Sequence, residues 1–265
     1  MSHSVAVRTR ASGLLVAASV LCGSSVGAGL ALPAGLAAQE TITSDRPGIG
    51  SGSGIVESGV VQVETGLGLG GGPSSTDLSV GQLFVRVGVS AVELELFGNS
   101  YVVDLESGSG GGNSEGLQAA GLGMKVPVVR SDAVSLSLQG LALLPSGSAT
   151  QGSDAWVFGL NALADFPVSE RVAVNGNVGV LSGNGIDPAW SANVTPSYAF
   201  GGSVSAYAGW AGVFTSGADV NFAEAGLAFL ANRNLQLDLN GGWSFDTDVW
   251  FLGGGLAIRW GAGPR

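Results

Sequence analysis

The chain has 265 residues, 46 of them glycine, and carries 20 acidic against 10 basic residues. This acidic balance disfavours nucleic acid as a partner, because nucleic-acid binding relies on Lys and Arg neutralising phosphates. Although 45% of the residues are hydrophobic, no uncharged apolar run after residue 39 approaches the roughly 20 residues that a membrane-spanning helix needs.

The first 38 residues have the three-part pattern of a secretory signal peptide. Arg8 and Arg10 precede the apolar run "GLLVAASVLCG", and small residues follow up to "AGLAAQE". We predict cleavage near Ala38. The alternative is an uncleaved anchor, since residues 11–39 carry no charge, but Pro33 and the many Gly and Ser residues disfavour a spanning helix.

Cleavage at this point would change the chemistry that is available to the chain. It would remove the single Cys, which follows Leu21 and so lacks the small preceding residue of a lipoprotein site, and the single His. Two of the 10 basic residues would go and no acid, leaving 8 basic against 20 acidic residues. Ser-His-Asp hydrolysis, Cys nucleophiles and His or Cys metal sites are then excluded by residue type. We therefore predict no enzyme, cofactor or metal.

Residues 39–58 form a segment that precedes the first clean alternation, and they contain the triplet Asp45, Arg46 and Pro47. One interpretation is a solvated turn in which Pro fixes a backbone dihedral. The other is a plug folded into the interior of a barrel, where Arg46 would meet inward carboxylates such as Glu64 or Glu224. The glycines of "GIGSGSG" would let such a segment turn back.

Apolar and polar residues alternate along almost all of residues 59–260, in blocks of about ten to thirteen residues, the length of a tilted transmembrane β-strand. We predict an all-β fold, a closed antiparallel transmembrane β-barrel of about 12 strands. The predicted strands are 59–70, 78–89, 92–104, 116–127, 133–145, 155–165, 171–182, 188–199, 203–214, 220–230, 234–244 and 249–260.

The predicted connections alternate between long and short. "GGPSSTD" is followed by "SA", and "SGNGID" is followed by "GG". Outer-membrane barrels have short periplasmic turns and longer external loops, and an even strand count leaves both termini periplasmic. A soluble sandwich has no reason for this alternation. Residues 261–265 would form a short C-terminal tail.

Tryptophans fall at the predicted strand ends, as in the aromatic girdles of membrane barrels. Four would lie at the external ends and the last at the periplasmic end: Trp156, Trp190, Trp243, Trp250 and Trp260.

The alternation also assigns charged side chains to the lumen, because each would cost a few kcal/mol if it faced lipid. The candidates are Glu64, Arg86, Glu93, Glu95, Lys125, Asp165, Glu224, Asp238 and Arg259. We expect Arg86 to lie across from Glu95 as an ion pair, and Arg259 to pair with Glu64 at the closing seam. Six acids against three bases predict a net negative lumen and a modest preference for cations.

Both ends of the region resemble a known family. "ITSDRPGIGSGSGIVESGVVQVETGL" and "ANRNLQLDLNGGWSFDTDVWFLGGGLAIRW" are similar to the N-terminal signature and the last hairpin of the putative MetA-pathway of phenol degradation family. The resemblance implies an outer-membrane barrel that passes small hydrophobic or aromatic compounds. The chain departs from the usual pattern of such barrels because Trp260 is followed by "GAGPR".

The sequence thus favours a porin-like transporter or narrow pore in a Gram-negative-type envelope. Its expected partners are outer-membrane lipid, the barrel insertion machinery and small-molecule solutes. The alternative is a structural or adhesive barrel without transport, although short Gly- and Ser-rich loops offer few anchors for a protein partner.

Overall fold

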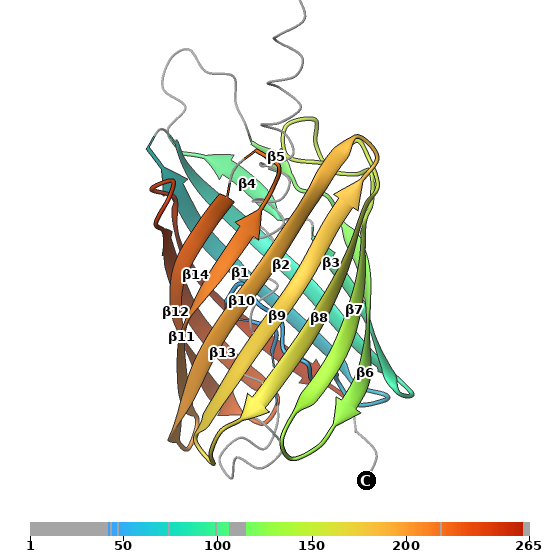
Figure 1. The fold of residues 1–265 in the computed structure, drawn as a ribbon, viewed down its shortest axis with the longest axis vertical. Helices are drawn as coiled ribbons and strands as arrows, with labels where there is room; N and C mark the ends of the chain where they lie inside the picture. Colours follow the sequence, from blue (N-terminus) through green and yellow to red (C-terminus); the bar gives the residue numbers. More distant parts are fainter. Residues whose placement is uncertain are drawn as a thin grey trace, which may run out of the picture.

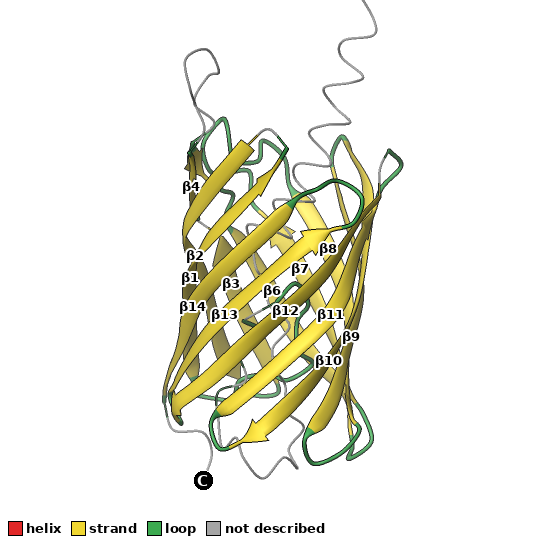
Figure 2. Ribbon diagram, turned by 90° about the vertical axis from the view of Figure 1, so that its left-hand side faces the viewer, coloured by secondary structure: helices red, strands yellow, loops and turns green. Residues whose placement is uncertain are grey.

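The protein is a single closed β-barrel (Figures 1 and 2). The computed structural model describes residues 42, 44–46, 48–73, 75–98, 100–105, 115–217 and 219–261. The predicted signal peptide, residue Pro47 and the end of the predicted tail lie outside the described residues. Within these ranges, no helix is long and apolar enough to cross a membrane.

Fourteen strand segments build the barrel wall. They are β1 (Val61–Gly72), β2 (Ser75–Val89), β3 (Val92–Gly98), β4 (Tyr101–Asp104), β5 (Gly116–Leu117), β6 (Gly121–Arg130), β7 (Ser135–Leu143), β8 (Val157–Pro167), β9 (Val172–Gly183), β10 (Ile186–Gly201), β11 (Val204–Phe214), β12 (Asp219–Asn232), β13 (Leu235–Ser244) and β14 (Trp250–Trp260).

The 14 segments make 12 strands, because two strands are each split in two. β3 and β4 both pair with β2, and they pair in turn with β6 and β5. All pairings are antiparallel, and β1 pairs with both β2 and β14, which closes the sheet into a barrel. The predicted closed antiparallel barrel of 12 strands is confirmed.

A close approach of backbone causes one of the two breaks. Gly98, the last residue of β3, has a φ of 106°, and a β-carbon on it would lie 2.8 Å from Cα of Ala120 in the neighbouring strand. Only glycine accommodates this conformation and this contact easily. The predicted strands 92–104 and 116–127 were therefore wrong as unbroken strands, although both occupy the expected places in the wall.

Two of the predicted long loops are also wrong. Most of "GGPSSTD" is strand, since Gly72 pairs with Ser75 in the β1–β2 hairpin. Likewise Gly183 pairs with Ile186, leaving a two-residue turn between β9 and β10 in which Gly185 has a φ of 74°. Gly and Ser lack the alternation that marks a strand, but their backbones hydrogen-bond across the hairpin all the same.

Both ends of the wall lie at one rim, because Val61 at the start of β1 pairs with Trp260 at the end of β14. We call this the terminal rim. It also carries the connections β2–β3, β6–β7, β8–β9, β10–β11 and β12–β13. Inside the barrel, toward the opposite rim, Phe84, Phe97, Leu143 and Val157 pack in an apolar cluster with Ala119.

Side chains alternate between the two faces of the wall, except where the register shifts, as it does between Glu64 and Gly66. In β1, Gln62 and Glu64 are fully buried, whereas Val61 is 37% and Leu67 55% exposed. The exposed set is apolar all around the outside, as lipid requires, and the buried set within the strands mixes polar or charged residues with apolar ones.

Candidate functional site

The lumen is occupied by the residues that precede β1. We call Ile42–Glu57 the lumen segment, of which the structure describes all but Thr43 and Pro47. Ile42 packs against Leu230 and Ala257 in the wall. From there the segment runs inside the barrel (Figure 1, blue) and returns to the terminal rim, where Glu57 forms an ion pair with Arg259.

Arg46 anchors the first part of the lumen segment. Its Nη1 donates to Oε1 of Gln82 over 2.8 Å, and its Nη2 lies 3.5 Å from Oδ1 of Asp238. Gln236 donates to its carbonyl oxygen over 3.1 Å. The guanidinium is only 1% exposed. Arg46 is bound by three side chains from β2 and β13, which lie on either side of the neighbouring strands β1 and β14.

Two wall glycines make room for this guanidinium. A β-carbon at Gly66 in β1 would lie 2.5 Å from Nη2 of Arg46, and one at Gly255 in β14 would lie 2.7 Å from Nε. A glycine in a strand often marks the close approach of another group. That signal is visible in the sequence, but which group approaches is not.

Asp45 joins a buried network of charges. Its Oδ2 lies 2.7 Å from Nζ of Lys125 and 3.6 Å from Nη2 of Arg86. Lys125 also lies 3.6 Å from Glu93 and 3.8 Å from Glu95. Buried charges require such compensation, because an isolated ion in a low-dielectric interior is strongly unfavourable.

Three acids of this network are close enough together to be considered as ligands of a metal ion. Ligand oxygens of Asp45, Glu93 and Glu95 lie within 4.8 Å of one another. The ammonium of Lys125 lies within 4 Å of all three. It therefore supplies the positive charge that a metal ion would otherwise bring.

The glycine-rich part of the segment is bound mainly through its backbone. Wall carboxylates accept from the amide of Ile49 (Glu224, 2.9 Å), the amide of Ser53 (Asp165, 2.7 Å) and the amide of Val56 (Glu93, 2.7 Å). Asn177 likewise accepts from the amide of Ser51 over 2.7 Å. Small residues suit this role because they bring the backbone close to the wall.

All nine charged side chains that the sequence assigned to the lumen are buried on the inner face, with exposed fractions of at most 8%. Their partners differ in part from the expected ones. Arg86 is in register with Glu95, as expected, but the ion pairs described for its guanidinium join Glu93, Glu64 and Asp45. Glu95 instead accepts two hydrogen bonds from Gln139, each 2.9 Å long.

The partners of Arg259 at the β1–β14 seam and of Arg46 in the lumen segment also differ from the expected ones. Arg259 pairs with Glu57 of the lumen segment and not with Glu64. Glu64 accepts from Ser44 Oγ over 2.7 Å and from the amide of Asp45 over 3.2 Å. The acid described beside Arg46 is Asp238, and neither Glu64 nor Glu224, because the wall position opposite a guanidinium depends on the path of the segment.

The five candidate girdle tryptophans lie at or near strand ends. Trp156, Trp190, Trp243 and Trp260 are between 46% and 61% exposed, and Trp250 is half-buried. Trp243 and Trp250 face each other across β13 and β14, and Trp260 lies at the terminal rim.

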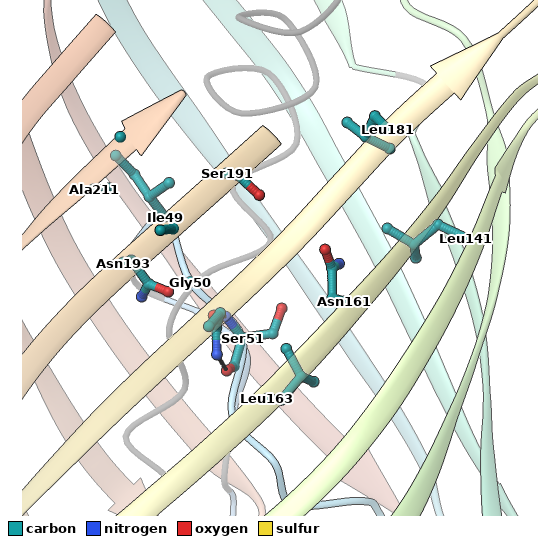
Figure 3. Close-up of a pocket in the computed structure, with 13 residues that line it drawn as sticks. Ile49, Gly50, Ser51, Leu141, Asn161, Leu163, Leu181, Ser191, Asn193 and Ala211 are labelled. Carbon is teal, nitrogen blue, oxygen red and sulfur yellow. Dashed lines mark hydrogen bonds between the residues drawn. The ribbon is translucent and has the colours of Figure 1, made fainter. Parts of the chain in front are cut away.

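A cavity remains between the lumen segment and the wall formed by β7 to β11 (Figure 3). Its volume is about 70 Å³. Ile49, Gly50 and Ser51 of the segment line one side. The wall contributes aliphatic, amide and hydroxyl groups: Leu141, Asn161, Leu163, Asn177, Leu181, Ser191, Ala192, Asn193, Ala211 and Gly212. None of the lining residues is charged. The sequence did not indicate this cavity.

Comparison with known proteins agrees with this architecture. A family model described as "Putative MetA-pathway of phenol degradation" matches residues 44–260. Among the curated proteins compared with the sequence, none matches.

Solved structures show the same fold at low sequence identity. The COG4313 outer membrane channel from Pseudomonas putida F1 has a TM-score of 0.60 at 13% identity, covering 77% of this chain and 97% of that one. The KdgM porin in complex with disordered oligogalacturonate has a TM-score of 0.56 at 8% identity, covering 74% and 98%. The NanC porin has a TM-score of 0.53 at 7% identity, covering 75% and 98%.

Proposed function

Because the chain belongs to the "Putative MetA-pathway of phenol degradation" family, we propose that it is an outer-membrane channel for small solutes, narrowed by its own lumen segment. The observation that carries this proposal is the course of the segment inside the closed barrel. It contacts wall residues on β1, β2, β3, β6, β8, β9, β12, β13 and β14, that is, around the barrel. Barrels of this size lie between filled small barrels and open porins.

The proposal extends to the arrangement in the envelope. We place the terminal rim in the periplasm, so that both termini lie there, and residues 1–38 act as a signal peptide that is removed on export. The barrel insertion machinery and outer-membrane lipid are then its partners. The apolar outer face and the exposed tryptophans near strand ends support this arrangement.

The solutes would be small, and hydrophobic or aromatic compounds are the proposed class. The family description refers to phenol degradation, and the remaining cavity is small. Ser-His-Asp hydrolysis and Cys nucleophiles are excluded by residue type in residues 39–265, since these contain no His and no Cys.

Swelling of proteoliposomes tests the proposal with the full chain. Vesicles loaded with an impermeant polymer are diluted into isotonic solutions of neutral solutes of increasing size. A narrow channel gives swelling that falls steeply as the solute grows. A structural or adhesive barrel gives no more swelling than protein-free vesicles for any solute, and that result would overturn the proposal.

A further inference from the structure

We infer that the cavity between Ile49–Ser51 and β7–β11 is a binding subsite for a neutral amphipathic solute whose polar group donates a hydrogen bond, such as a small alcohol. The inference deepens the proposed function and rests on it, because it assigns a solute to the lumen of the proposed channel. It follows from the distribution of charge, the size of the cavity and the orientation of two amides.

Charge is distributed unevenly around the lumen. The ion-pair network lies on β1, β2, β3 and β6, with Asp238 and Arg46 on the side of β13. The cavity lies against β7 to β11 and has no charged lining residue. The nearest acid along β8, Asp165, is occupied by Ser53 and Asn175. An anionic solute would therefore lose its hydration without gaining a counter-charge.

The size of the cavity limits the ligand. Since one water molecule takes up roughly 10–15 Å³ of such space, a cavity of about 70 Å³ accommodates a solute of about six non-hydrogen atoms. Leu141 and Leu181 lie on the side toward the apolar cluster that contains Phe84 and Phe97. Asn161 lies between them and Ser51 (Figure 3). The cavity is thus apolar at one end and polar at the other.

The first amide is oriented by a chain of hydrogen bonds. Both oxygens of Glu95 accept from Nε2 of Gln139, so the Oε1 of Gln139 must point away from the carboxylate. That oxygen accepts from Nδ2 of Asn161 over 3.0 Å. The amide nitrogen of Asn161 is thereby used on the wall, and its carbonyl oxygen is left for the cavity.

A second series of hydrogen bonds, which starts at Asp165, orients the amide of Asn193. Asp165 accepts from Nδ2 of Asn175 over 2.8 Å, which turns Oδ1 of Asn175 toward Asn193. Asn193 donates Nδ2 to that oxygen and to Oγ1 of Thr195, each over 3.4 Å. Each relay begins at a carboxylate, which only accepts, and ends at an amide whose nitrogen donates to the wall.

The cavity therefore offers hydrogen-bond acceptors. Among the residues that the structure describes, Oδ1 of Asn161, Oδ1 of Asn193 and Oγ of Ser191 make no hydrogen bond. Asn177, in contrast, is occupied at both ends by the backbone of Ser51. Two carbonyl oxygens and a hydroxyl favour a ligand that carries an O–H or N–H group, because a buried acceptor left without a donor is costly.

Gly179 creates the space for this group. A β-carbon there would collide with Oδ1 of Asn161 and would lie 2.9 Å from Oγ of Ser191. The absence of a side chain at this position keeps the two polar groups of β8 and β10 accessible to the same ligand atom.

Methyl NMR of the full chain in lipid nanodiscs, with leucines labelled at their methyl groups, tests the inference. The probes are 1-pentanol, 2-pentanone and butanoate, which have the same number of non-hydrogen atoms. We expect 1-pentanol to shift the methyls of Leu141 and Leu181 saturably, and to bind at least about tenfold more tightly than 2-pentanone, which cannot donate. Butanoate should cause no shift. Leu239, which faces lipid, reports partitioning into the bilayer.

Two substitutions separate the subsite from general effects on the barrel. Ser191→Ala should weaken 1-pentanol binding several-fold, whereas Ser205→Ala, the same change at a buried position near the terminal rim, should not. Deleting residues 39–54 should abolish binding, because it removes Ile49–Ser51. Equal binding of ketone and alcohol, or shifts at Leu239 only, would overturn the inference. Because binding is measured without transport, saturable binding in a barrel that conducts nothing would refute the proposed channel and leave the subsite intact.

Discussion

Arg46 and Gly66 are complementary in shape: the guanidinium fills the space that a side chain at position 66 would occupy, and a β-carbon there would lie 2.5 Å from Nη2. The pair joins the lumen segment to the first strand of the wall. The glycine at position 66 of the wall thus leaves the space in which Arg46 of the lumen segment lies.

Gly66→Ala should therefore destabilise the closed arrangement. We expect a loss of about 1–3 kcal/mol in the free energy of unfolding, because the added methyl group would meet the guanidinium of Arg46 and the carbonyl oxygen of Gly254, 2.7 Å away. Arg46→Ala in the same chain should recover part of this loss, since the two residues are in contact. Urea-induced unfolding in lipid vesicles measures the free energy of unfolding of Gly66→Ala, of Arg46→Ala and of the double variant.

Gly70→Ala is the matched control in the same strand. A β-carbon at Gly70 meets only the carbonyl oxygen of Trp250, at 3.5 Å, which is an ordinary contact. If Gly70→Ala destabilised the barrel as much as Gly66→Ala, the effect would belong to strand glycines in general and the role given to Arg46 would be wrong.

The buried charge network predicts an order of effects. Lys125→Met should cost more stability than Asp45→Asn, because Lys125 lies within 4 Å of three acids, whereas the Asp45→Asn change would leave Lys125 beside Glu93 and Glu95. Removing one member of a buried ion pair costs about 3–5 kcal/mol. Thermal unfolding, with Arg171→Met at an exposed position as the control, measures the order. The reverse order would show that Asp45 is the centre of the network.

The hydrogen bonds between Asp165 and Ser53 predict a local effect on amide hydrogen exchange. Asp165→Ala removes the acceptor for both the amide and the hydroxyl of Ser53, at 2.7 and 2.5 Å. Hydrogen bonds to charged groups contribute about 1.5–3 kcal/mol each, so the amide of Ser53 should exchange with solvent at least about tenfold faster. Asp187→Ala, which alters an exposed acid bonded to Ser216, should leave that rate unchanged. Equal rates in both variants would contradict the described contact.

Most of the barrel could be predicted from the sequence, because a period of two residues fixes both the strands and their faces. Glu64, Arg86 and Glu93 face the lumen as their positions in the alternation require. The glycine-rich stretch around Gly72 and Ser75 could not be predicted, because strand pairing there depends on backbone hydrogen bonds and leaves no pattern of side chains.

The partners of the lumen charges were harder to predict than their positions. Register places Arg86 opposite Glu95, but an arginine side chain is long enough to reach several acids, and Asp45 enters the network from a segment outside the sheet. The same holds for Arg259 and Glu57. The cavity depends on where Ile49–Ser51 lie, which no local pattern in the sequence specifies.

A preference for cations stays a prediction. The buried acids in the lumen, including Asp45, outnumber the buried bases, including Arg46, and charged groups that line a pore favour the opposite ion. The preference should be modest, because most of these groups are paired, and should grow as salt falls and screening weakens. Reversal potentials across a salt gradient measure it. An anion preference in the full chain would show that the charge balance of the lumen does not control permeation.

The conductance of single channels in planar bilayers, compared between the full chain and a variant without residues 39–54, tests the central claim most directly. The wall ladder does not depend on this segment, so the variant should still fold, as its electrophoretic mobility before and after boiling will show. We expect its conductance to rise several-fold over that of the full chain, while removal of residues 262–265 changes nothing. A folded deletion variant with the conductance of the full chain would contradict the claim that Ile42–Glu57 narrows the lumen.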